Sequence, residues 1–312
     1  MLAAAEPPSV HGRLRALISP HAGYKYSGPS AAVGYRLLQG RQYRRVLVLA
    51  PAHRGGFRGL SIAEVGAYRT PLGEVPLDLE AVQALRRSPL VGAQHEAHQG
   101  EHAIEIQLPF LQRSLAPGWR LLPILVGRMD EGDQATAAEL LRPWFDQDSL
   151  LLVSSDFTHY GWRFGYQPFP PDAQAAERLR ALDLGAFESI AGGDPEAFRA
   201  YRRETDITVC GAEPILILLE LLPAGTRAEL LDYATSGAQS GDSRHSVSYL
   251  SIGFFDSEAQ SLAPEHLQYL HRLAGYAVRE SADPGNGALD GLQALVEGLP
   301  ETLRRPGGAF VT

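Results

Sequence analysis

Residues 45–53 read RVLVLAPAH. A short run of valine and leucine, typical of a buried strand, ends in small residues, a proline and a histidine. The same succession occurs at residues 14–21, LRALISPH, and at residues 150–159, LLLVSSDFTH. Ligands of open α/β sheets bind outside the carboxyl ends of parallel strands. If the three strands are neighbours, His21, His53 and His159 are therefore predicted to converge on one site.

Strand-like and helix-like segments alternate along the chain, which predicts a layered α/β/α fold with a mixed, largely parallel sheet. Two strands close to each other, joined by the turn-rich SGAQSGDSRH, are expected to form an antiparallel edge. The predicted strands are 14–18, 45–50, 60–65, 120–126, 150–154, 228–234 and 246–255. The predicted helices are 30–38, 79–87, 102–115, 134–144, 172–182, 194–202 and 213–222.

A break near DSEAQSLAP, residues 256–264, divides the chain into a first domain, 1–256, and a linker with a further segment, 257–312. The second part holds two short helical patterns separated by SADPGNGALDG. About fifty residues are too few for a comfortable independent core.

The composition narrows the function classes. The 312 residues carry a formal net charge of −8 and form no basic run, which argues against a nucleic-acid partner. The longest apolar stretch, PILILLELLP, is shorter than the roughly 20 residues that a membrane span needs. The N-terminus does not resemble a signal peptide, so we expect a cytoplasmic protein without a membrane anchor.

The chain has one cysteine, Cys210, at the predicted start of an apolar helix. A helix N-terminus favours a thiolate, although a free cysteine is also often an inert core residue. Together with His21 and His53 it forms a candidate set of soft metal ligands. Taken singly, each histidine is more often structural, and it is the repeated position at strand ends that favours a shared site.

Four further residues are candidates for the same cleft. Glu101 and His102 open a predicted helix, where Glu101 could equally act as a cap. Tyr24 and Tyr26 alternate with glycines in HAGYKYSG, and we expect them to be walls of a pocket. Asp156, three residues before His159, is expected to orient that histidine or to take a proton, the alternative being an Asx turn or a helix cap.

Five motifs in order, HAGYKYSG, PAH, EHAIEIQLPFL, SSDFTHYG and CGAEP, resemble the Memo family over about residues 12–256. The resemblance implies a fold similar to the LigB-type class III extradiol dioxygenases, which use non-haem iron. It further implies a metal site of His21, His53 and Cys210, with Asp156 and His159 lining the same pocket. The second motif departs from the usual GP(S/N)H, because APAH stands here.

The C-terminal segment, with HLQYLHRLAGYAVRE and LPETLRRPGGAFVT, resembles the opening of an AMMECR-type domain. This resemblance implies an association with radical-SAM and AMMECR-type proteins.

Three functions follow as hypotheses. The first is a metal-dependent redox enzyme of unknown substrate holding iron(II) or copper, with zinc as a further candidate, in which His159 serves as acid or base. The second is a non-catalytic module that keeps the cleft and binds a peptide or protein. The third is a hydrolase with Cys210 as nucleophile and His159 as its base.

Overall fold

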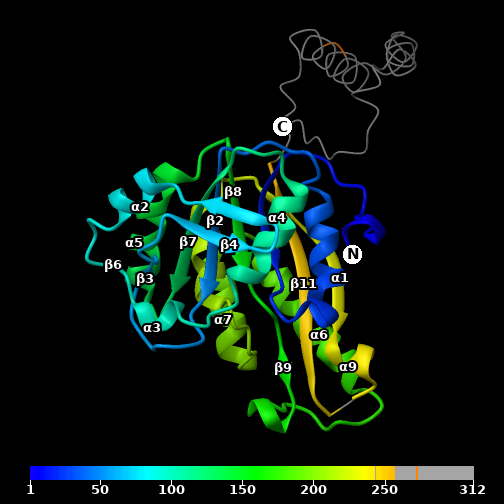
Figure 1. Cartoon of the computed structure of the whole chain (residues 1–312). Coiled ribbons are helices and arrows are strands. Elements are labelled where there is room, and N and C mark those ends of the chain that lie inside the picture. The colour runs from blue at the N-terminus through cyan, green and yellow to red at the C-terminus, as the bar shows by residue number, and fades with distance from the viewer. Residues whose placement is uncertain (243, 257–271, 273–312) are drawn as a thin grey trace, which may run out of the picture. The chain divides into compact units, whose positions relative to one another are not determined.

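The computed structural model describes residues 1–242, 244–256 and 272 (Figure 1). Its main sheet has the strand order β10-β11-β1-β8-β2-β7-β3-β6, and β9 pairs with β11 beside this path. The four central strands, β1, β8, β2 and β7, are mutually parallel. Strand β11 pairs antiparallel with β10 and β1, and β3 pairs antiparallel with β7 but parallel with β6. The predicted mixed and largely parallel sheet is therefore confirmed, including its antiparallel edge.

The elements of the main sheet vary in length. They are β1 (Leu14–Ser19), β2 (Arg45–Pro51), β3 (Leu60–Ser61), β6 (Val91–Gly92), β7 (Arg120–Val126), β8 (Ser149–Ser154), β9 (His159–Tyr160), β10 (Arg227–Thr235) and β11 (Ser246–Phe255). A separate hairpin is formed by β4 (Ala67–Thr70) and β5 (Gly73–Pro76).

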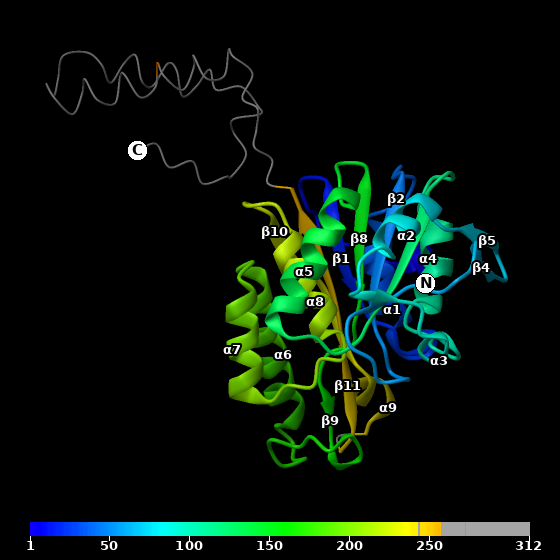
Figure 2. The same cartoon turned by 90° about the vertical axis from the view of Figure 1, so that its left-hand side faces the viewer.

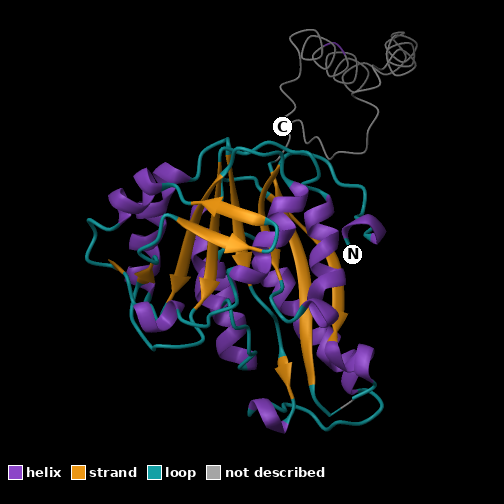
Figure 3. Cartoon of the chain, in the orientation of Figure 1, coloured by secondary structure: helices purple, strands orange, loops and turns teal. Residues whose placement is uncertain are grey.

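Helices cover both faces of the sheet, as Figures 2 and 3 show. On one face, α1 (Tyr24–Arg36) packs on β1, β10 and β11. On the other, α8 (Ala212–Leu221) packs on β2 and β8, with α5 (Glu131–Leu141) beside it. The remaining helical elements are η1 (Leu2–Ala4), α2 (Leu79–Leu85), α3 (His95–His98), η2 (Glu105–Gln107), α4 (Leu108–Ser114), η3 (Arg142–Trp144), η4 (Trp162–Phe164), α6 (Ala175–Ala191), α7 (Pro195–Thr205) and α9 (Ser236–Ser240).

The central strands are buried along their whole length. Every residue of β1, β2 and β8 is buried, because helices lie on both faces of the parallel part of the sheet. This explains why these strands read as unbroken apolar runs and not as an alternation of polar and apolar residues.

The position of β8 between β1 and β2 sets the place of the site. Val153 of β8 is paired with Ile18 of β1 and also with Leu49 of β2. All three strands run in one direction, so the chain leaves each of them at the same edge of the sheet. His21, His53 and the SSDFTHY loop therefore begin within a few residues of this edge.

The predicted helices are present with shifted bounds, and the starts of two of them differ most from the expectation. The helix expected at 30–38 begins earlier, at Tyr24, so the segment that carries Tyr24 and Tyr26 is the first turn of α1 and not a glycine-bearing loop. The helix expected at 102–115 forms only from Leu108, after a 3₁₀ turn. Pro109 fits the first turn of α4 and would disfavour a longer helix through it. The strand expected at 60–65 shortens to Leu60–Ser61.

The domain division at residue 256 stays a prediction, because all of 257–312 except Arg272 lies outside the described residues. Across the part of the chain that the structure describes, no helix combines the length and the apolar character needed to cross a bilayer.

Helix α1 approaches the sheet closely at Gly34, which yields a prediction. A Cβ atom there would lie 2.5 Å from Ser251 Oγ and 2.7 Å from Leu17 Cδ1. We expect Gly34→Ala to destabilise the protein by about 1–3 kcal/mol through overpacking, despite the better helix propensity of alanine. Urea unfolding measures the change.

The exposed glycine of α5 provides the control. Gly132→Ala places its Cβ 3.3 Å from Asp130 Oδ1 in an otherwise open position and is expected to leave stability unchanged or slightly higher. Equal unfolding free energies for the two variants would contradict close packing at Gly34.

Candidate metal centre

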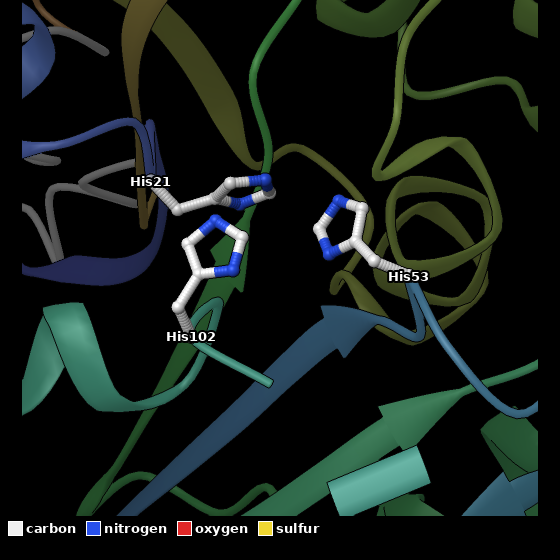
Figure 4. Close-up of side chains that lie close together, drawn as sticks. All are labelled: His21, His53 and His102. Atoms are coloured by element: carbon white, nitrogen blue, oxygen red, sulfur yellow. The ribbon is translucent and has the colours of Figure 1, made fainter. Parts of the chain in front are cut away.

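Three histidines converge beyond the carboxyl ends of β1 and β2, which lie on either side of β8. The ring centroids are 5.1 Å apart for His21 and His53, 5.6 Å for His21 and His102, and 5.3 Å for His53 and His102. Each imidazole offers one nitrogen, and the three nitrogens lie within 4.8 Å of one another. Figure 4 shows the three rings turned toward a common space.

His53 is held by the buried carboxylate of Glu101. Its backbone N–H donates to Glu101 Oε2 over 2.8 Å, and its Nδ1 lies 3.0 Å from Oε1. Since an ionised carboxylate only accepts hydrogen bonds, Nδ1 carries a hydrogen, and in the neutral imidazole Nε2 therefore keeps a free lone pair. A histidine fixed by a carboxylate in this way has the arrangement of a metal-ligating imidazole with its supporting residue.

Glu101 stays ionised although its side chain is buried. Burial raises the pKa of its carboxyl group, but the hydrogen bonds from the His53 side chain and from the amides of Ala103 and His53 outweigh it and lower the pKa to about 2. The same contact with Glu101 raises the pKa of His53 against the effect of burial. The amide of His102 also donates to Glu101, so one carboxylate positions two of the three histidines.

The tautomer of His21 is fixed by a serine. The hydroxyl of Ser154 has one hydrogen, and it donates this to the carbonyl of Ala103 over 2.7 Å. His21 Nδ1 lies 2.9 Å from the same oxygen and must therefore be the donor of that contact. The lone pair of His21 is thus on Nε2. Burial lowers the pKa of His21 to about 4, which keeps the imidazole neutral at physiological pH.

A glutamine from the EHAIEIQLPFL motif supports this serine. Gln107 Nε2 donates to Ser154 Oγ over 2.9 Å and to the carbonyl of Pro20 over 3.1 Å. The hydroxyl of Tyr35 in α1 donates to Gln107 Oε1 over 2.6 Å, which fixes the orientation of the amide. All of these side chains are buried. The network joins α1, the 3₁₀ turn η2 and the end of β8 behind His21.

Cys210 lies next to the free nitrogen of His21. Its Sγ is 3.3 Å from His21 Nε2, and the amide of Asp156 donates to the sulfur over 3.2 Å. The sequence favoured a thiolate here because a helix follows. The structure differs, because burial, with a further contribution from the charge of Asp156, raises the pKa of the Cys210 thiol well above its usual value. A nearby cation would reverse this balance.

The glycine after Cys210 lets the two segments touch. A Cβ on Gly211 would lie 2.4 Å from Ser155 Cβ and 2.9 Å from the carbonyl oxygen of Ser154. The amide of Gly211 donates to Ser155 Oγ over 3.0 Å. The CG pair thus brings the start of α8 against the end of β8, and Cys210 is held beside His21.

The donor set fits a transition-metal ion. Two ligands each about 2.0–2.3 Å from one ion stand roughly 3–4 Å apart. The separation of Cys210 Sγ and His21 Nε2 is already in this range, and the histidine nitrogens would need only small side-chain rotations. Nitrogen and sulfur donors select copper, iron or zinc over magnesium or calcium.

Comparison with known proteins matches residues 2–253 to the family described as Memo-like protein. The chain belongs to the Memo family. The Memo-1 homologue of Caenorhabditis elegans is 35% identical over 216 residues, which are 67% of this chain and 61% of that protein. The chain thus matches about three fifths of the length of this relative.

Archaeal members of the Memo family match over more of their length. A MEMO1 family protein of Methanosarcina mazei is 35% identical over 75% of this chain and 84% of its own length. One from Aeropyrum pernix is 36% identical over 76% of this chain and 82% of its own length. A solved structure, that of the uncharacterized protein JW3007 from Escherichia coli K12, aligns with a TM-score of 0.48 at 14% identity, covering 77% of this chain and 99% of that chain.

Asp156 connects the loops of this Memo family protein. Its Oδ1 accepts the amides of His21 over 2.8 Å and Ala22 over 3.3 Å. The carboxylate thereby fastens the loop after β8 to the loop after β1. Its role toward His159, which the sequence suggested, stays a prediction.

His159 lies on β9 and is held by a threonine that precedes Cys210 by two residues. Its amide donates to Thr208 Oγ1 over 2.9 Å, and its Nδ1 lies 3.2 Å from the carbonyl of Thr208. A carbonyl only accepts, so the hydrogen is on Nδ1 and Nε2 is free. The neighbouring Thr158 donates from both its amide and its hydroxyl to the buried Asp183 of α6.

The two tyrosines lie on the first turn of α1. The Tyr24 hydroxyl donates to the carbonyl of Ile106, and Tyr24 lines a cavity together with Phe110 and Met1. The carbonyl of Tyr26 accepts from Gln239. Neither residue is among those that line the cavity next to His53 and Cys210, and their role as pocket walls stays a prediction.

Sequence reasoning placed His102 in the pocket and not among the metal ligands. It also missed Ser154, Gln107 and Thr208 as supporting residues. Serine, glutamine and threonine are common everywhere, so only their positions inside the SSDFTHYG, EHAIEIQLPFL and TVCG segments could have drawn attention to them.

The ionisation of Glu101 gives a prediction of pH dependence. Its folded pKa, about 2, lies below the ordinary 4.5, so its contribution to stability is full above pH 4.5 and is lost as the pH falls through 2. We expect Glu101→Gln, in metal-free protein, to lose about 2–3 kcal/mol of unfolding free energy at pH 7. The loss should shrink as the pH falls below 4.5.

Glu105→Gln, an exposed change four residues further along the chain, is the control and should have a small effect at every pH. A deficit of Glu101→Gln that is constant between pH 7 and pH 3 would refute this assignment. Denaturant unfolding at each pH supplies the measurement.

Proposed function

We propose that this Memo family protein is a metal-dependent redox enzyme that holds iron(II) or copper, with zinc as the third candidate, and acts on a small molecule. The observation that carries the proposal is the convergence of His21, His53 and His102, with the thiol of Cys210 3.3 Å from His21 Nε2. Histidines with a purely structural role need only a hydrogen-bond partner on one ring nitrogen, as His21 and His53 have on Nδ1. Here one nitrogen of each of the three rings also faces the other two.

Hydrogen bonds prepare His21 and His53 for metal binding. Glu101 and Ser154 hold the hydrogens of His53 and His21 on Nδ1, so both Nε2 atoms are available. Because the supporting residues are buried and bonded in turn, little ordering remains to be done when a cation binds. This degree of preparation favours a metal site over a purely structural cluster.

The identity of the remaining ligand distinguishes two forms of the site. Cys210 would give two imidazoles and a thiolate, a set that favours iron or copper over harder cations. His102 would give three imidazoles, a set that suits zinc, copper and iron alike. His102 is more exposed, with 53% of its side chain accessible, so it is better placed than Cys210 to move when a substrate binds.

Iron or copper bound there would supply one-electron chemistry and an attachment point for a substrate oxygen. The protein's own residues would then bind and orient the substrate. His159, with a free Nε2 and its Nδ1 turned to Thr208, is proposed to accept or donate a proton. Asp156 is proposed to keep the loops after β1 and β8 in place through the amides of His21 and Ala22.

The test is metal content after anaerobic reconstitution. We expect about one iron(II) or copper ion per chain, and we expect His53→Ala to lower the affinity by more than about tenfold. His95→Ala, an exposed histidine on α3, is the control and should bind as the wild type does. Equilibrium dialysis followed by elemental analysis measures both.

Two single variants separate the forms of the site. A larger loss in Cys210→Ser than in His102→Ala would assign the thiolate as the third ligand, and the reverse would assign His102. Unchanged iron and copper binding in a His53→Ala, Cys210→Ser double variant would overturn the proposal and would favour a module that binds a peptide or protein.

The interaction partners remain proposals as well. The association with radical-SAM and AMMECR-type proteins depends on the segment 257–312, where only Arg272 is described. A cavity of about 610 Å³ beside His53 and Cys210 favours a small-molecule ligand.

A further inference from the structure

A cavity of about 610 Å³ lies against the candidate metal centre. Both His53 and Cys210 line it, so a molecule bound there would be next to the proposed metal ligands. Pockets for small organic ligands commonly have volumes of about 300–1,000 Å³. The cavity is therefore of a size to hold a substrate of this site.

Two arginines from different loops line the cavity. Arg54 directly follows His53 in the connection from β2 to β3, and Arg128 lies in the connection from β7 to α5. Within the part of the chain that the structure describes, neither guanidinium forms an ion pair or a side-chain hydrogen bond. The nearby Arg58 differs, because it is paired with both Asp130 and Asp133.

The negative charge in the lining is already compensated. Glu213, at the start of α8, is the acidic residue of the lining. One of its carboxylate oxygens accepts from Gln134 Nε2, and the other lies 3.6 Å from Arg202 Nη1. The cavity thus has two uncompensated positive charges in a chain whose formal net charge is −8.

We propose that this cavity binds the oxyanion of an anionic small molecule, a phosphate or a carboxylate, at Arg54 and Arg128. Guanidinium groups recognise both kinds of oxyanion through paired N–H donors. The rest of the molecule extends toward His53 and Cys210. This inference rests on the proposed function, because it names the substrate class of the same site.

The chain next to Arg54 and Arg128 is rich in glycine. Gly55, Gly56 and Gly127 line the cavity without side chains. Gly55 and Gly56 have positive φ angles of 75° and 22°, so the chain turns sharply directly after Arg54. Part of the cavity wall next to the arginines is therefore backbone, and a Cβ atom on Gly56 would meet nothing within 4 Å.

The experiment measures binding of inorganic phosphate and of acetate to the full chain by calorimetry at low ionic strength. It is done first on metal-free protein, so that a bound metal cannot attract the anion. We expect Arg54→Gln and Arg128→Gln each to weaken phosphate binding by about tenfold. Arg58→Gln removes the same charge outside the cavity and should change the affinity by less than about twofold.

The comparison of the two anions identifies the source of the oxyanion. Tighter binding of phosphate than of acetate assigns a phosphorylated ligand, and the reverse assigns a carboxylate. Wild-type affinity in both arginine variants, or an equal loss in Arg58→Gln, would overturn the inference, as would a wild-type chain that binds neither anion.

Two separate measurements on the wild-type chain keep the outcome distinct from that of the proposed function. Phosphate binding is measured on metal-free protein, and uptake of iron or copper is measured without phosphate or acetate. Metal binding without anion binding would refute only the inference about the cavity. Anion binding without metal binding would refute only the proposed metal centre.

Discussion

The site depends on the pairing of one strand, β8, with β1 on one side and β2 on the other. Val153 is in register with both Ile18 and Leu49, so three parallel strands end at one level. From these paired residues the chain needs only three or four residues to reach His21, His53 and Asp156. A slip of the register by one residue would turn every side chain of β8 to the opposite face of the sheet. Ser154 would then no longer accept from His21.

Beyond the strand ends, the site is stabilised by buried hydrogen bonds whose donors and acceptors are matched. Glu101 accepts from His53, His102 and Ala103, and Ser154 mediates between His21 and Gln107. Buried polar groups are costly unless they are paired, so such a network is stable in essentially one arrangement. The outcome is that the lone pairs of His21 and His53 face the same space. Next to it lie a thiol and a cavity with two arginines that have no ion-pair partner among the described residues.

The pattern of apolar residues along the chain was sufficient to predict the layered fold and the positions of the histidines after β1 and β2. The reason is that buried parallel strands appear in the sequence as continuous apolar runs. It was less informative where tertiary contacts compete with local propensity. The segment 102–107 has helical periodicity, yet Glu101 draws the amides of His102 and Ala103 to its carboxylate and the helix starts later, at Leu108. The short strand β6 and the hairpin β4–β5 escaped prediction for another reason, because two to four residues carry too little periodicity.

Three features were determined by the sequence by itself. They are apolar runs that end in a histidine, one cysteine before an apolar helix, and five motifs of the Memo family. Only the tertiary structure decided that His102 joins His21 and His53, that Ser154 and Glu101 set their tautomers, and that Arg54 and Arg128 share a cavity with Cys210. The physical reason is distance along the chain. These groups are up to 189 positions apart, as for Cys210 and His21, and no local pattern records which side chains a folded sheet brings within hydrogen-bonding reach.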